Sequence, residues 1–243
     1  MFKMLRKALK GIIKVGLLAL LVFGGLTYYF RHVDHLREKL LTRVQVKVRD
    51  HQIRPLTYTQ IPSLYREAVT ATEDRRFSWD PGIDPVGILR SLVVDVRQDG
   101  YVEGGSTITQ QLVDNTLVQR QKSLRYKLTQ AFYAIGIYDT FSKEQTFQMY
   151  ANLIYFGQGA YGLYNASETY FGKSPGQLNA GELTMLAGLP NAPSVYDPFN
   201  HMALARQRQS IVLKNMVDDG LISAQESVAI YKQPIQLRGA AGK

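Results

Sequence analysis

EGGSTITQQLVDN, residues 103–115, places two glycines before a run of small hydroxyl side chains and two adjacent amides. Glycine permits backbone conformations, and a close approach of a ligand, that a side chain would block. Thr107 followed three residues later by Gln110 matches a capping box, so a helix is predicted to begin here. A helix start presents free N–H groups and a positive dipole end, which suits a phosphate or a hydroxyl-rich sugar. The alternative interpretation is a flexible loop that leads into an ordinary helix.

The composition bounds the class of protein. The chain has 243 residues and is 45% hydrophobic, enough for a sizeable core in one large or two small domains. Cysteine is absent, which excludes disulfides and cysteine-ligated metals but does not identify the compartment. The formal net charge of +9 favours an anionic partner: nucleic acid, a membrane surface or a phosphate-bearing substrate.

The first 35 residues narrow that choice. Residues 15–30, VGLLALLVFGGLTYYF, extended back to Gly11, give about 20 residues, enough to cross a bilayer if Lys14 reaches the interface. Tyr28, Tyr29 and Phe30 are expected at the far interface as an aromatic belt. No small-residue cleavage site follows, so an uncleaved anchor is predicted, with a buried core helix as the alternative.

The charges around this run indicate its direction. Basic residues precede it at Lys3, Arg6, Lys7, Lys10 and Lys14. Their excess favours a cytoplasmic N-terminus. We therefore expect residues 1–35 to form a basic cytoplasmic tail and one transmembrane anchor, and residues 36–243 to form one domain outside the cytoplasm.

The periodicity of the remaining chain predicts a mostly α-helical domain. Helices are expected at 34–43, from Leu64 to the carboxylates Glu73 and Asp74, at 86–98, about 107–118, 123–140, 143–155, 179–188 and 201–219, and after Ser223. Residues 44–48 alternate valine with polar side chains and predict a strand. Residues 156–173 and 189–200, rich in glycine and proline respectively, are expected to be loops.

Glu73 and Asp74 are adjacent carboxylates at the end of a predicted helix. There they meet the negative end of the helix dipole, which is unfavourable. We expect them to be offset by Arg75 and Arg76 or to be retained for function.

Several segments together resemble the peptidoglycan glycosyltransferases, glycosyltransferase family 51. EDRRFxxxxGID at 73–84 resembles their first signature, GGSTITQQLxxN at 104–115 the second, and residues 143–152, with Tyr150 and Asn152, the fourth. The resemblance is extended over about residues 45–235 by YFGK at 170–173, Glu182, LAGLPNAPSVYDP at 186–198 and RQRQSIVLKNM at 206–216. The transpeptidase signatures Ser-x-x-Lys and Lys-Thr-Gly are not found, so the resemblance is to the monofunctional type.

This resemblance implies a lysozyme-like, two-lobed fold and a definite reaction. It implies that the chain polymerises lipid II into glycan strands at the outer face of the bacterial cytoplasmic (inner) membrane. The anomeric carbon would be inverted and undecaprenyl pyrophosphate released. The implied partners are lipid II, the growing glycan strand, the membrane and other cell-wall synthesis proteins, and no nucleic acid.

The resemblance also implies roles for individual residues. Glu73 would be the general base for the acceptor's 4-hydroxyl, a proton transfer typically worth about 10²–10⁴-fold. Lys122 and Lys127 would neutralise the leaving pyrophosphate, with or without Mg²⁺ or Mn²⁺, for which no protein ligand is assigned. The other residues implied to bind substrate are Asp74, Phe77, Gly105, Ser106, Thr107, Gln110, Gln111, Asn115, Gln130, Tyr150 and Asn152.

The chain departs from the family pattern near the expected chemistry. Asp80 stands where the family has His, Asp114 where it has Lys, and Gln148 where it has Glu. The third signature, Arg-Lys-x-x-Glu, corresponds here to Tyr126, Lys127 and Gln130.

These departures leave more than one function open. The Asp114 charge near a dry pyrophosphate site would cost on the order of a few kcal/mol. Gln130 can neither take a proton nor ligate a metal as an anion, although losing one acid and one base balances the local charge. The alternative to an active enzyme is a weak or inactive member that binds lipid II or scaffolds a wall-synthesis complex. A lysozyme-type hydrolase would need a second carboxylate near Glu73, and Asp74, Asp80 and Asp84 are candidates.

Overall fold

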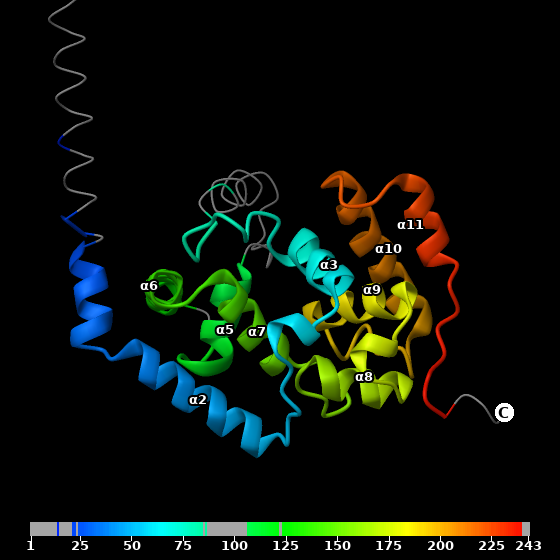
Figure 1. Ribbon diagram of the computed structural model, residues 1–243, viewed down its shortest axis with the longest axis horizontal. Helices are drawn as coiled ribbons and strands as arrows, with labels where there is room; N and C mark the ends of the chain where they lie inside the picture. The colour runs from blue at the N-terminus through cyan, green and yellow to red at the C-terminus, as the bar shows by residue number, and fades with distance from the viewer. Residues whose placement is uncertain are drawn as a thin grey trace, which may run out of the picture.

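The computed structural model describes residues 14, 21–22, 24–84, 86, 106–121 and 123–239, and these residues are mostly helical (Figure 1). The helices are α2 (Leu36–Asp50), η1 (Tyr58–Gln60), α3 (Ser63–Glu73), α5 (Ile108–Thr116), α6 (Leu124–Thr140), α7 (Lys143–Leu153), α8 (Leu163–Phe171), η2 (Pro175–Gln177), α9 (Ala180–Gly188), η3 (Leu189–Asn191), α10 (Met202–Asp218) and α11 (Ala224–Tyr231). Within the described ranges, β-pairing is limited to one isolated bridge between Tyr155 and Tyr161.

Two hydrophobic clusters hold these helices together. One joins α3, α8, α9 and α10 and contains the fully buried Tyr65 and Leu186. The other joins α2, α5 and α6 and contains the fully buried Leu40 and Ile137. Helix α7 lies between the two sets of helices in Figure 1 and supplies buried side chains to both clusters. Helix α5 therefore lies close to the junction, since it packs against both α6 and α7.

Helix α5 begins as its capping-box pattern predicts. The Thr107 hydroxyl accepts a hydrogen bond from the Gln110 N–H, and the Gln110 side chain accepts one from the Thr107 N–H, both at 3.0 Å. Ile108, Leu112 and Val113 are fully buried beneath the helix. Burying each such side chain contributes about 1.5–3 kcal/mol, so packing fixes which way the polar side of α5 faces.

Most of the other predicted helices are confirmed. The helices expected from Leu64, at 123–140, 143–155, 179–188 and 201–219, and after Ser223 correspond to α3, α6, α7, α9, α10 and α11. The helix expected at 86–98 falls outside the described residues, apart from residue 86.

The strand predicted at residues 44–48 is wrong, because these residues continue α2 to Asp50. Leu36 and Leu40 are fully buried, and Val44 and Val48 pack against the same cluster. Four apolar side chains at steps of four residues follow one face of a helix. The alternation seen over five residues is part of this longer helical repeat.

The loop predicted at 156–173 is also wrong in its second half, which forms α8. Gly162 and Gly172 flank this helix as its N-cap and C-cap, with φ angles of 80° and 64°. Glycine is favoured where a helix ends in the left-handed conformation. The glycines of this segment therefore bound a helix and do not break one.

The expected membrane anchor lies largely outside the described residues. Within the described part of the chain, no helix is both long enough and apolar enough to cross a membrane. Phe30, which we expected in an interfacial aromatic belt, is instead 1% exposed, with its ring centroid 4.6 Å from that of Phe132 on α6. This part of the expectation is wrong, because Phe30 belongs to the hydrophobic cluster of α2 and α6.

Candidate active site

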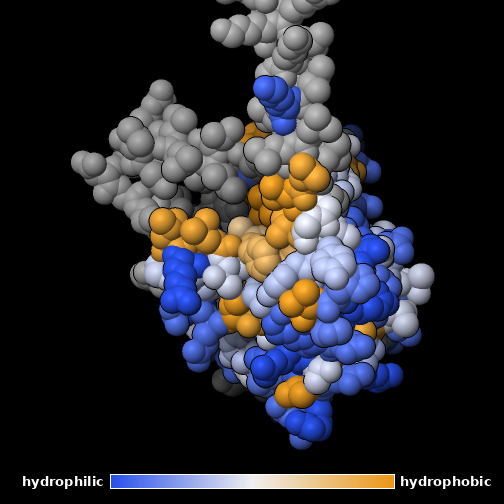
Figure 2. Space-filling view, turned by 90° about the vertical axis from the view of Figure 1, so that its left-hand side faces the viewer, coloured by the Kyte–Doolittle hydropathy of each residue, from blue (hydrophilic) through white to orange (hydrophobic). Residues whose placement is uncertain are grey.

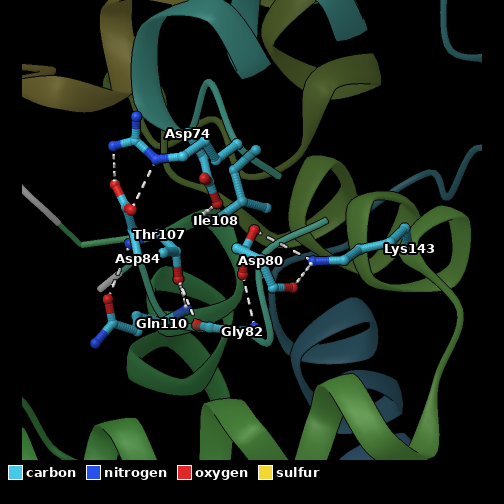
Figure 3. A network of polar contacts seen from close by, with 9 residues as sticks. Asp74, Asp80, Gly82, Asp84, Thr107, Ile108, Gln110 and Lys143 are labelled. Carbon is cyan, nitrogen blue, oxygen red and sulfur yellow. Dashed lines mark hydrogen bonds and ion pairs between the residues drawn. The ribbon is translucent and has the colours of Figure 1, made fainter. Parts of the chain in front are cut away.

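Asp74 directly follows α3, and its carboxylate faces the start of α5 (Figure 3). Its Oδ2 accepts a hydrogen bond from the Ile108 N–H at 3.0 Å. The positive end of the helix dipole favours a carboxylate there. We expected free N–H groups at this helix start that would bind an anion. This prediction is wrong for two of them, because the Ile108 N–H bonds to Asp74 and the Gln110 N–H bonds to the Thr107 hydroxyl. The protein supplies its own anion at this helix start.

Gly82 holds the turn after Asp80 against both α5 and α6. Its carbonyl accepts a hydrogen bond from the Thr107 hydroxyl at 2.7 Å, and its N–H donates to Asp80 at 2.6 Å. Its φ is +87°, and a Cβ there would lie 2.3 Å from the Ala134 carbonyl oxygen of α6. Both the conformation and the space therefore require glycine.

The charged side chains around this turn shift one another's pKa values. Asp80 is fully buried and forms an ion pair with Lys143 Nζ at 3.2 Å. Burial, and then the charge of nearby Asp80, raises the pKa of Asp74 to about 7. Burial also raises the pKa of Asp80, while Lys143 acts in the opposite direction. Asp74 can therefore hold or release a proton around neutral pH.

Two distant parts of the chain hold Glu73, the last residue of α3. Gln111 Nε2 donates to its Oε2 at 2.9 Å, and Arg208 Nη2 of α10 pairs with its Oε1 at 3.1 Å. The Glu73 and Arg208 side chains are only 10% and 12% exposed, so salt screens this pair weakly. Tyr150 belongs to the same group, since its hydroxyl donates to Gln111 Oε1 at 3.5 Å. We call Glu73, Gln111, Tyr150 and Arg208 the Glu73 group.

Of the two alternatives for Glu73 and Asp74, pairing with Arg75 and Arg76 is wrong, and retention for function stays a prediction. Arg75 pairs with Asp219, and Arg76 pairs with Asp84. Arg208 was missed as a site residue because it lies 135 positions from Glu73, within a helix whose basic side chains look alike in sequence.

A second polar group lies between α5 and α6. Gln130 Nε2 donates to both carboxylate oxygens of Asp114 at 2.6 Å, and the Tyr126 hydroxyl donates to Asp114 Oδ1 at 2.6 Å. Lys127 Nζ donates to Gln130 Oε1 at 3.2 Å and to Ser106 Oγ at 3.1 Å. We call these five residues the Gln130 group. Its members Asp114, Tyr126 and Gln130, three departures from the family pattern, are in direct contact.

The remaining predicted residues are placed less centrally. Phe77 is buried, with Lys143 Nζ 4.6 Å from its ring centroid. Asn115 bonds to the Gln111 carbonyl one turn earlier in α5. The Asn152 side chain bonds to both the N–H and the carbonyl of Leu56, so it fastens the segment that leads to η1. The predicted residues Gly105 and Lys122 lie outside the described residues.

A resident metal does not fit the described residues. Within the described ranges, no three acidic, histidine or cysteine side chains cluster closely enough to hold a metal ion. Asp114, the carboxylate beside Lys127, already accepts hydrogen bonds from Gln130 and Tyr126. We therefore derive no catalytic step through a metal.

Comparison with known proteins finds a matching family model, similar sequences and one solved structure that aligns with the chain. The transglycosylase family model matches residues 37–217. The chain is 42% identical to penicillin-binding protein 1A of Aquifex aeolicus over 179 residues, which cover 74% of this chain and 25% of that protein. It is 40% identical to a protein of Cupriavidus necator provisionally named a transglycosylase, covering 74% of this chain and 77% of that protein. The crystal structure of penicillin-binding protein 1A from Haemophilus influenzae aligns at 22% identity with a TM-score of 0.45, covering 76% of this chain and 18% of that one.

The chain belongs to the transglycosylase family, the glycosyltransferases of peptidoglycan. It spans about a quarter of the length of the penicillin-binding proteins that it matches.

Proposed function

We propose that this chain is a peptidoglycan glycosyltransferase that joins lipid II units into glycan strands and releases undecaprenyl pyrophosphate. The hydrogen bond between Gln111 and Glu73 carries the proposal. It brings the second family signature onto the carboxylate of the first. The family match supports this function, and so does the contact between these two motifs.

Glu73 acts at the acceptor end of the reaction. Gln111 and Arg208 fix its position, and each carboxylate oxygen still has capacity for a further hydrogen bond. Glu73 takes the proton of the acceptor's 4-hydroxyl, whose oxygen then bonds to the donor's anomeric carbon. The bond from that carbon to the pyrophosphate breaks, and the pyrophosphate leaves with its electron pair.

Lys127 acts at the leaving-group end. Its ammonium is a compact positive charge, held by neutral acceptors on Ser106 and Gln130. Charge accumulates on the pyrophosphate as the bond breaks, and a preplaced cation stabilises this more in the transition state than in the ground state. Lys122 is proposed as a second cation, and Mg²⁺ or Mn²⁺ would enter as an ion carried by the pyrophosphate.

The membrane location is part of the same proposal. We propose a lysozyme-like domain of two lobes, supported by the two hydrophobic clusters, on a single anchor with a cytoplasmic N-terminus in the bacterial inner membrane. Leu124 and Leu128 of α6 are 76% and 63% exposed. Figure 2 views the side of the molecule that carries α6 and shows the larger hydrophobic patches on its upper part, above a lower part that is mostly hydrophilic. Such a face suits an enzyme whose substrate is embedded in lipid.

The test is to give the purified full chain labelled lipid II in detergent and to separate the products by gel electrophoresis. We expect glycan strands that a muramidase digests. Bound lipid II without strands would favour the inactive binder or scaffold and contradict the proposal. Release of fragments from preformed strands would indicate a hydrolase and also contradict it.

A further inference from the structure

Gln130 is a fully buried amide whose donors and acceptor are all engaged. Its Nε2 bonds to the Asp114 carboxylate and lies 3.1 Å from the Tyr126 hydroxyl. Its Oε1 accepts hydrogen bonds from Lys127 at 3.2 Å and from Gln110 Nε2 at 3.4 Å. A buried amide with every polar atom paired has one well-defined orientation.

Asp114 determines that orientation. A carboxylate only accepts hydrogen bonds, so it requires the NH₂ end of the Gln130 amide to face it. A reversed amide would place Oε1 against both carboxylate oxygens and would turn an NH₂ group toward the Lys127 ammonium. Both changes replace attraction with repulsion. The carboxylate on α5 therefore directs a carbonyl oxygen on α6 toward Lys127.

Lys127 is thereby fixed in direction without losing its charge. Both of its hydrogen-bond acceptors, Ser106 Oγ and Gln130 Oε1, are neutral. Among the residues that the structure describes, no carboxylate forms an ion pair with it. A carboxylate at position 130 would hold the ammonium more strongly but would neutralise much of its charge.

We propose that Asp114 and Gln130 form a positioning relay that holds Lys127, with which no described carboxylate forms an ion pair, as a cation for the leaving pyrophosphate. This inference rests on the proposed function and assigns a role to two residues that look like losses when compared with the family pattern. Asp114 acts through Gln130 and does not touch the substrate. Gln130 is required as an amide, and a glutamate there is harmful in this chain.

The first test is whether Asp114→Asn lowers or raises kcat/KM for lipid II. Asparagine offers a donor as well as an acceptor, so the Gln130 amide is no longer forced to face Lys127 with its oxygen. We expect kcat/KM for lipid II to fall by about three- to tenfold, the usual effect of losing one ordinary hydrogen bond. If Asp114 instead repels the pyrophosphate, removing its charge raises kcat/KM, and an unchanged or raised value overturns the relay. Asp218→Asn, an exposed carboxylate on α10, is the matched control.

The second test is Gln130→Glu, which places two carboxylates in contact and pairs one of them with Lys127. We expect kcat/KM to fall by about tenfold or more. If Gln130 is a lost catalytic or metal-binding acid, the glutamate raises activity, and that result overturns the relay. A thermal melt shows whether Gln130→Glu is folded. If this variant does not fold, the result for Asp114→Asn decides whether the relay exists.

Binding of inorganic pyrophosphate separates the relay from the proposed function, because it needs no turnover. We expect pyrophosphate to raise the melting temperature of the wild type and of Asp218→Asn, with a smaller shift for Asp114→Asn and Gln130→Glu. In a Lys127→Met background, Asp114→Asn should change the shift no further, which a purely structural role would not produce. No response in a wild type that polymerises lipid II would overturn the relay alone. A normal response without polymerisation would contradict the proposed function alone.

Discussion

The Glu73 group and the Gln130 group both depend on α5 but are built in different ways. Around Glu73 the family residues are present, and a charged partner, Arg208, arrives from α10. Around Gln130 three family residues are replaced, and the replacements bond to one another. The Glu73 group contains an ion pair. In the Gln130 group the carboxylate lies on α5, at Asp114, whereas the family pattern has it on α6, at position 130, and Asp114 does not pair with Lys127.

The difference shows that a departure from a family pattern has to be judged by its contacts. Asp114 alone places a negative charge near an expected pyrophosphate, and Gln130 alone removes an acid. Together with Tyr126 they form a satisfied hydrogen-bonded group, which costs far less than an unpaired buried charge. The comparison can be tested by changes that affect both groups, or only one of them.

The largest effect is expected from Gly82→Ala, which disturbs the support of both groups. The new Cβ would meet the Ala134 carbonyl at 2.3 Å at a φ of +87°. We expect a loss of about 3 kcal/mol or more in the free energy of unfolding, roughly 6–12 °C in Tm. Thermal melts followed by circular dichroism measure it, with Gly176→Ala, where no atom lies within 4 Å, as the control. A melting temperature like that of the control would contradict the role of Gly82.

Arg208→Met should break the Glu73 group alone. It removes the charged partner from a carboxylate that is 10% exposed. We expect kcat/KM to fall by about 10–100-fold, the value of a hydrogen bond between charged groups, with partial recovery in Arg208→Lys. The shift in Tm with pyrophosphate should stay unchanged, since the Gln130 group is intact. Activity within about threefold of a Lys214→Met control would contradict this role.

Asp74→Asn tests the start of α5, on which both groups depend, through the pH dependence of stability. The pKa of Asp74 is raised to about 7 by burial and by Asp80, from an ordinary value of 3.8. The folded state therefore binds more protons than the unfolded state between these values, and its stability falls as pH rises through this window. Asparagine avoids that loss, so we expect its stability relative to wild type to be higher at pH 8 than at pH 5, by about 2–3 kcal/mol. Equal differences in Tm at both pH values would show that Asp74 has no raised pKa.

Tyr126→Phe should have the smallest effect, confined to the Gln130 group. It removes the hydroxyl that donates to Asp114 Oδ1 at 2.6 Å, while Gln130 still bonds to both carboxylate oxygens. We expect a loss of about 0.5–1.5 kcal/mol in unfolding free energy and of about two- to threefold in kcat/KM. A larger loss than that of Asp114→Asn would mean that the phenol, and not the carboxylate, orients the group.

The parts that sequence could predict are those determined by neighbours in the chain. The start of α5 depends on two residues three positions apart, and the place of Glu73 at the end of α3 follows from helical periodicity. The strand at 44–48 was wrong because a five-residue window hid a helical repeat that begins at Leu36. The contacts that define the site could not be predicted, since Arg208 reaches Glu73 across 135 positions and Gln130 reaches Asp114 across 16.

The most direct test of the account is the initial rate of lipid II polymerisation by Glu73→Gln. Glutamine keeps the shape and one acceptor oxygen for Arg208, its NH₂ end requires the Gln111 amide to turn its oxygen toward it, and it cannot take the proton. We expect a loss of about 10²–10⁴-fold, with the melting temperature and lipid II binding close to those of wild type. Glu144→Gln, an exposed carboxylate at the start of α7, should retain the full rate. A Glu73→Gln variant that polymerises lipid II within about threefold of wild type would contradict the central claim.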